Sequence, residues 1–202
     1  ASAAAVNSGL VSIIPPPDFS GTMSITVEGI ARNANLQTAS TGAQPLPIEV
    51  DPVADGVNIS VAPDAGIEDT PVNLNISLGE RDVDGSEVIG GFAYVSLSNG
   101  AMLVGSYAQV MAGDSDATID GTSLVGYYRV PVAAIGTLQA LPASNWHGTI
   151  AATVAAYSVE PLDDNDGDNV RLSTSAFSIN VSADADAPAV SAPASVSGDE
   201  DT

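Results

Sequence analysis

The chain has 202 residues, of which 25 are acidic and only four are basic, so its formal net charge at pH 7 is −21. Such a charge repels phosphate, which excludes nucleic acid and anionic membrane surfaces as partners. Apolar residues still make up 45% of the chain, cysteine is absent, and no stretch reaches the ~18 apolar residues of a membrane span. We therefore expect a packed core without disulfides and no direct membrane insertion.

Short segments in which apolar and polar residues alternate predict β-strands along the whole chain. In the first of them, Met23, Ile25 and Val27 alternate with polar neighbours, which is the period of a half-buried strand. Gly, Pro, Asn and Asp pairs mark turns between the segments, and only 131–140 predicts a short helical turn. The pattern predicts an all-β fold, an antiparallel β-sandwich, with strands in 22–27, 46–50, 57–62, 71–77, 92–97, 149–155 and 177–181.

The motifs recur at a nearly constant distance, which is typical of a tandem array. The linker residue Asp55 returns as Asp186 after 131 residues, and the segment 14–23 resembles 141–150 at an offset of 127. We divide the chain into 1–54, the C-terminal part of a preceding repeat; 55–186, one complete repeat; and 187–202, the first strand of the next. The apolar face predicted for the first part has no second sheet in this chain.

Acidic residues gather at both expected ends of the complete repeat. In a sandwich, loops 79–87 and 160–169 lie beside the incoming linker, and the turn at 68–69 lies beside the outgoing linker. Clustered carboxylates repel one another unless they are protonated or neutralised, and hard cations such as Ca²⁺ take six to eight oxygen ligands. The candidate Ca²⁺ ligands are Asp55, Glu68, Asp69, Asp82, Asp84, Glu87, Asp163, Asp164, Asp166, Asp168, Asp184 and Asp186.

Neither acidic loop matches a known calcium loop. Residues 80–85 imitate the front half of an EF-hand loop, but Gly91 occupies the position of the bidentate Glu, and the loop around Gly167 fails similarly. The alternative is that these are solvated acidic turns, because Asp-Gly and Asn-Gly are ordinary hairpin residues. Both interpretations remain open at this stage.

Taken together, these motifs resemble the tandem Ig-like, cadherin-like repeats of giant bacterial RTX adhesins. The resemblance is carried by Val53-Ala54-Asp55, Gly66-Ile67-Glu68-Asp69-Thr70, Asp82-x-Asp84-Gly85-Ser86-Glu87, Asn99-Gly100-Ala101 and Pro17-Asp18-Phe19-Ser20-Gly21. It implies an extracellular protein of the bacterial cell surface, secreted by a type I system, with repeats that Ca²⁺ rigidifies. It also implies that 1–54 is part of an Ig-like domain that can be split by an insertion. One departure is the loop 31–35, which lacks the acids of 163–168.

We therefore expect a non-enzymatic, Ca²⁺-rigidified structural extender of an adhesin that acts in cell adhesion and biofilm formation. Its partners would be neighbouring repeats of the same chain, and adjacent modules would contact a host or microbial glycan or peptide. The main alternative is a Ca²⁺-dependent glycan- or peptide-binding module that uses 163–169 and 104–130, and a third is an accessory domain of a secreted hydrolase. His147 is the single histidine, and it does not suggest a catalytic triad.

Overall fold

A computed structural model describes residues 9, 11–82, 85–161, 167–192, 194–195, 197–198 and 200. The prediction of an all-β fold is confirmed, and the predicted helical turn is a short 3₁₀ helix, Val132–Thr137. No helix in the described part of the chain is long and apolar enough to cross a bilayer. The strands are β1 (Gly21–Val27), β2 (Ile30–Arg32), β3 (Thr38–Ser40), β4 (Gln44–Val50), β5 (Val57–Val61), β6 (Gly66–Ile67), β7 (Val72–Asn73), β8 (Ile76–Glu80), β9 (Val88–Leu97), β10 (Met102–Leu103), β11 (Thr118–Ile119), β12 (Thr122–Ser123), β13 (Tyr128–Pro131), β14 (Gln139–Leu141), β15 (Gly148–Val159) and β16 (Val170–Ser182).

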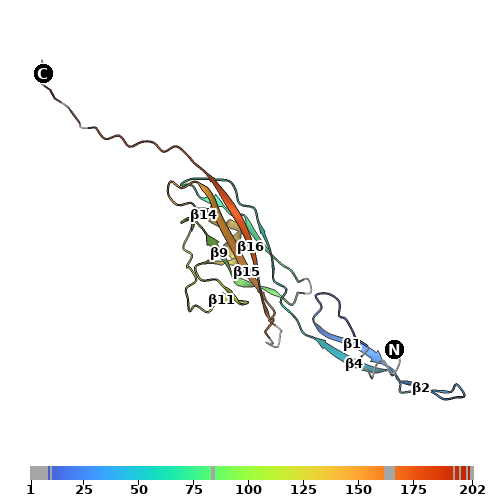
Figure 1. The fold of residues 1–202 in the computed structure, drawn as a ribbon. Helices are drawn as coiled ribbons and strands as arrows, with labels where there is room; N and C mark the ends of the chain where they lie inside the picture. Colours follow the sequence, from blue (N-terminus) through green and yellow to red (C-terminus); the bar gives the residue numbers. More distant parts are fainter. Residues whose placement is uncertain are drawn as a thin grey trace.

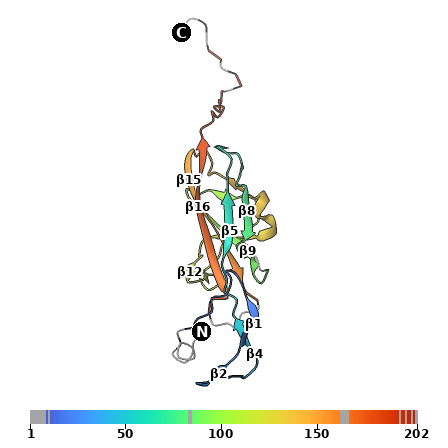
Figure 2. The same ribbon diagram turned by 90° about the vertical axis from the view of Figure 1, so that its right-hand side faces the viewer.

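The strands are arranged along one long axis. The β1–β4 hairpin, with the small β2–β3 hairpin beyond it, lies past one end of the main body (Figure 1), and the segment after β16 leaves from the opposite end in both views (Figure 2). The main body contains all the other strands. The described residues after Ser182 carry no strand, so the first strand predicted in 187–202 stays a prediction.

The main body is organised around a five-stranded sheet in the order β13-β9-β15-β16-β6. Its pairs are antiparallel except for β16 and β6, which run parallel. Two smaller sheets, β10-β14-β7 and β5-β8, face it across an apolar core. The fully buried aliphatic residues of that core, which come from both sides, include Leu74, Val95, Val130, Leu138, Ile150, Val154 and Ile179.

A second, smaller core lies on the outer face of the five-stranded sheet. Because side chains alternate across a strand, Tyr94 and Ala155 point away from the main core. Val110 and Leu124, both 0% exposed, come from the long segment between β10 and β13 and pack on these residues. The Asp116 carboxylate fastens this segment, because it accepts hydrogen bonds from the Tyr94 hydroxyl at 2.8 Å and from Arg129 Nε at 2.6 Å. Part of the segment 104–130 is therefore committed to covering the sheet.

The repeat expected from the sequence has a counterpart in strand register. In the first hairpin Gly21 pairs with Val50, and in the second Gly148 pairs with Val181, which are the positions predicted by the offsets of 127 and 131. The turn before each hairpin is also alike. Asp18 and Asn145, equivalent residues three positions before the glycine, both have a left-handed backbone with φ of 56° and 54°. The two hairpins thus share their register and the backbone geometry of the preceding turn.

Candidate metal centre at the junction of the two units

The linker into the complete unit is fixed by backbone hydrogen bonds. The buried Ala54 N–H donates to the Asp168 carbonyl at 3.1 Å, which brings the 160–169 loop beside the linker. Gly56 has φ of +95°, and a Cβ there would lie 2.6 Å from Ser173 Oγ. Only glycine accepts both the left-handed backbone and this close approach. The direction in which the linker enters the main body is therefore set by a single residue.

Glu87 locks the linker to the loop after β8. Its side chain is 3% exposed, and its Oε1 accepts hydrogen bonds from Asp55 N at 2.7 Å and Gly56 N at 3.0 Å. Its Oε2 lies 3.4 Å from the Asp82 N–H, which also donates to it. These backbone N–H groups satisfy oxygens of a buried side chain that would otherwise lack hydrogen-bond partners. Glu87, a candidate metal ligand in the sequence, thus acts in this structure as a latch between the linker and the loop after β8.

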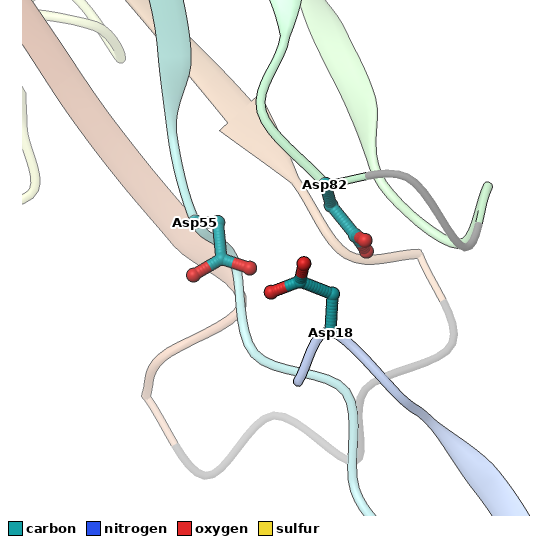
Figure 3. A group of neighbouring side chains, drawn as sticks. All are labelled: Asp18, Asp55 and Asp82. Carbon is teal, nitrogen blue, oxygen red and sulfur yellow. The ribbon is translucent and has the colours of Figure 1, made fainter. Parts of the chain in front are cut away.

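Three carboxylates meet next to this latch (Figure 3). Asp18 comes from the turn before β1, Asp55 from the linker, and Asp82 from the loop after β8. One carboxylate oxygen from each lies within 4.8 Å of the other two, and the three side chains point toward a common space. The cluster therefore joins the first unit, the linker and the complete unit. Among the described residues it is the only group of three acids this close together.

Burial and the neighbouring acids disfavour the charged form of Asp55. Burial raises the pKa of its carboxyl group, and the neighbouring charges of Asp18, Glu87 and Asp82 raise it further. Arg81 lowers that pKa, and its Nη1 donates a hydrogen bond to the Asp55 carbonyl oxygen at 3.4 Å, but its charge does not cancel the acids. The part of this rise that comes from the neighbouring carboxylates reflects a repulsion that added positive charge would relieve.

The loop 160–169 reaches the same junction. Glu160, 1% exposed, has its Oε1 3.0 Å from the Ser86 hydroxyl, and that hydroxyl also lies 3.1 Å from Asp82 Oδ2. Ser86 thus connects the two acids. The carbonyl oxygen of Asp168 reaches the linker by accepting the Ala54 N–H. The candidates Asp84, Asp163, Asp164 and Asp166 lie outside the described residues.

At the end of the main body beside the outgoing linker, the carboxylates of Glu68 and Asp69 accept hydrogen bonds from backbone N–H groups. Glu68 Oε1 accepts a hydrogen bond from Asp184 N at 2.6 Å, which ties the turn to the outgoing linker, as the sequence order suggested. Asp69 Oδ1 accepts one from Asn145 N at 3.0 Å. His147 Nδ1 lies 3.9 Å from Glu68 Oε2. Asp184 and Asp186 are exposed and do not join a three-acid group within the described part of the chain.

Sequence reasoning placed the loops that carry Ser86 and Glu160 at this end but proposed neither residue for the site, and it did not place Asp18 there. The repeat carried a signal for Asp18, because its equivalent Asn145 precedes the outgoing linker in the same way. Comparisons of the chain with protein-family models, with curated proteins and with solved structures found no significant match.

Proposed function

We propose that this chain is a structural extender whose units are held in line by Ca²⁺, as part of a secreted adhesin on a bacterial cell surface. The proposal includes an Ig-like, cadherin-like β-sandwich for 55–186. Two features support it: sheets on both sides of one apolar core, and the recurrence of the same hairpin at a fixed offset. Its partners are neighbouring repeats of the same polypeptide, and it has no catalytic role.

One observation carries the proposal, namely that Asp18, Asp55 and Asp82 belong to three segments on both sides of a junction. Two domains joined by a short linker move relative to each other by default. A cation held by all three carboxylates would bind the two units at once and restrict that motion. Rigid junctions are what a protein needs if its task is to project other modules away from a surface.

The donor set suits Ca²⁺. All three side chains offer carboxylate oxygens, which hard cations prefer, and no histidine is among them. Asp18 and Asp55 are at least partly exposed, so solvent can complete a coordination shell of six to eight oxygens. Asp18, Asp55 and Asp82 would hold the ion, while Glu87 keeps the linker and loop in place for them. The ion would supply only the positive charge that holds the units together.

Calcium binding is tested by thermal unfolding and calorimetric titration of the full chain with Ca²⁺ or EDTA. A ligand that binds the native state alone adds RT ln(1 + [L]/Kd), about 2.7 kcal/mol at a hundredfold excess over Kd. We expect the melting temperature to rise with millimolar Ca²⁺, and Asp18→Asn or Asp82→Asn to reduce the rise. Glu49→Gln removes the same charge from exposed strand β4 and should leave the response unchanged. A melting temperature that is the same with Ca²⁺ and with EDTA would contradict the proposal.

The extender role is tested by small-angle scattering of the full chain. A clamped junction should give a longer and narrower scattering envelope with Ca²⁺ than with EDTA. Asp55→Asn should make the two profiles alike, since it removes the linker ligand. Identical profiles for the unsubstituted chain would show that any bound ion does not control the hinge. Of the segments considered for a glycan- or peptide-binding module, 104–130 provides the second core, so no specific observation favours that alternative.

A further inference from the structure

The β1–β4 hairpin exposes an apolar face that is buried in its counterpart. Residues separated by the offset of 127 occupy equivalent positions in the two units, and the exposed fraction of their side chains differs greatly. On the hairpin, Val27 is 47% exposed against 0% for Val154; in the segment before the hairpin, Val11 is 48% exposed against 2% for Leu138, and Ile13 is 42% exposed against 0% for Ala140. Met23, Ile25, Ile48 and Val50 on the same hairpin are half-buried, where their counterparts are buried.

The hairpin also has an unpaired strand edge. In the complete unit β15 lies between β16 and β9, and β9 pairs with it through Val95 opposite Val154 and Leu97 opposite Ala152. The equivalent strand β1 pairs only with β4 among the described residues. An exposed strand edge next to an exposed apolar face is a template for another strand. The free edge of β1 is therefore the edge that corresponds to the one on β15 where β9 pairs.

We propose that this face is a docking surface for a segment with the strand pattern of residues 57–127, and that this segment precedes the hairpin in the natural polypeptide. The complete unit shows what the occupant must supply. A β9-like strand pairs along the edge of β1, and strands like β5, β7 and β8 cover the apolar face, as Val57, Leu74 and Ile76 cover β15 and β16. This inference is independent of the proposed calcium function.

A second copy of the chain fits the surface less well. Two β1–β4 hairpins packed face to face would bring together two chains that each carry a net charge of −21. Each chain would contribute a hairpin with the same exposed aliphatic residues. Such a dimer would not reproduce the arrangement of the complete unit, in which β9 pairs with β15 and other strands cover the apolar face. By contrast, the covering segment in the complete unit precedes β15 in the same chain, so its closure requires no association between molecules.

Hydrogen exchange of the full chain, with and without a graft, tests the proposal. Position 128 aligns with position 1, so a copy of residues 55–127 joined ahead of Ala1 provides the missing strands in the order of the complete unit. In the ungrafted monomer, amides of 22–27 should exchange at least about a hundredfold faster than those of 149–154, because local stability governs their protection. The graft should raise protection in 22–27 and 46–50 by about tenfold or more.

A matched pair of substitutions separates docking from a simple loss of folding. In the ungrafted chain, Val154→Asp should abolish protection of the complete unit, whereas Val27→Asp should leave its melting temperature unchanged. In the grafted chain, Val27→Asp should cancel the gain in protection. The proposal is overturned if 22–27 is as protected as 149–154 in a strictly monomeric sample, or if the graft leaves protection unchanged. Protection that appears only in a dimer would assign the surface to a second copy and would also overturn it.

Discussion

The hairpins β1–β4 and β15–β16 have the same register and the same left-handed turn before the first strand, yet only the second lies in a core. Ile48 and Ile179 occupy the same position in the two hairpins, and only Ile179 is fully buried. Strand pairing and turn geometry are therefore properties of the local sequence. Burial depends on segments elsewhere in the chain, in this case on β5 to β10.

The two turns differ in what they contact. Asp18 meets Asp55 and Asp82 of the following unit, whereas the backbone of Asn145 is held by Asp69 of its own unit. The structure thus shows the first turn in contact with the unit that follows it, and the second turn in contact with its own unit.

The largest expected effect separates the two hairpins directly. Ile179→Ala should destabilise the complete unit by about 2–5 kcal/mol, because it leaves a cavity in a packed core. Ile48→Ala, the same substitution at the equivalent half-buried position, should cost about 1 kcal/mol or less. Urea unfolding with an unchanged m value measures both. Equal losses would show that the first hairpin is already part of a closed core.

The next effect concerns the latch at the first junction. Glu87→Ala should cost the complete unit about 1–3 kcal/mol, because backbone N–H groups of Asp55 and Gly56 lose a buried acceptor. Glu87→Gln keeps one acceptor oxygen and should restore part of the loss. Glu68→Ala at the other end removes an acceptor from Asp184 N in the outgoing linker and should lower stability less. Denaturant unfolding of the three variants tests this order, and a silent Glu87→Ala would contradict it.

The two linkers provide a third comparison. Gly56→Ala should cost about 1–3 kcal/mol, since φ is +95° and the new Cβ would meet Ser173 Oγ. Ala187 is the equivalent residue of the second linker and is exposed, so Ala187→Gly should change stability by less than about 0.5 kcal/mol. Thermal unfolding distinguishes the two. A tolerated Gly56→Ala would mean that the linker can enter the main body in another direction.

The smallest effect distinguishes the two units by pH. Burial raises the pKa of the Asp116 carboxyl group, but hydrogen bonds from Arg129 and Tyr94 and the Arg129 charge outweigh it and hold that pKa below 3.8. A folded-state pKa below the unfolded value adds stability at higher pH, and this stability is lost as pH falls below about 4 through the folded pKa.

Acid should therefore loosen the segment between β10 and β13, which only the complete unit contains. The protection factors of the Val110 and Leu124 amides should fall below that pH, while Asp116→Asn should lower them already at neutral pH and reduce their response to acid. The other charged group facing Arg129 is Asp114, at 3.1 Å, and Asp114→Asn serves as the milder control. An acid response that survives Asp116→Asn would assign it to other carboxyl groups.

The sequence by itself determined the all-β class, several of the strands and the recurrence of one hairpin, whereas its single strand over 71–77 was wrong, because β7 and β8 lie there in different sheets. These features follow from local rules: alternation of apolar residues with a period of two, turn residues at fixed places, and recurrence at a constant offset. The same reasoning brought the loops 79–87 and 160–169 to the incoming linker, where the structure places Glu87 and Glu160. The aliphatic residues of 1–53 also revealed a face without a second sheet.

Only the tertiary structure decided which acids meet and what they do. Asp18 joined the cluster because three segments distant in sequence converge at the junction, and no local pattern encodes that convergence. Glu87 and Glu68 are candidate metal ligands in the sequence, and in the structure their oxygens accept backbone N–H groups, contacts set by distances that only the folded chain defines. The segment 104–130 was considered in the sequence as part of a ligand-binding module, and in the structure part of it forms a second core because Tyr94 and Ala155 leave an apolar outer face to cover.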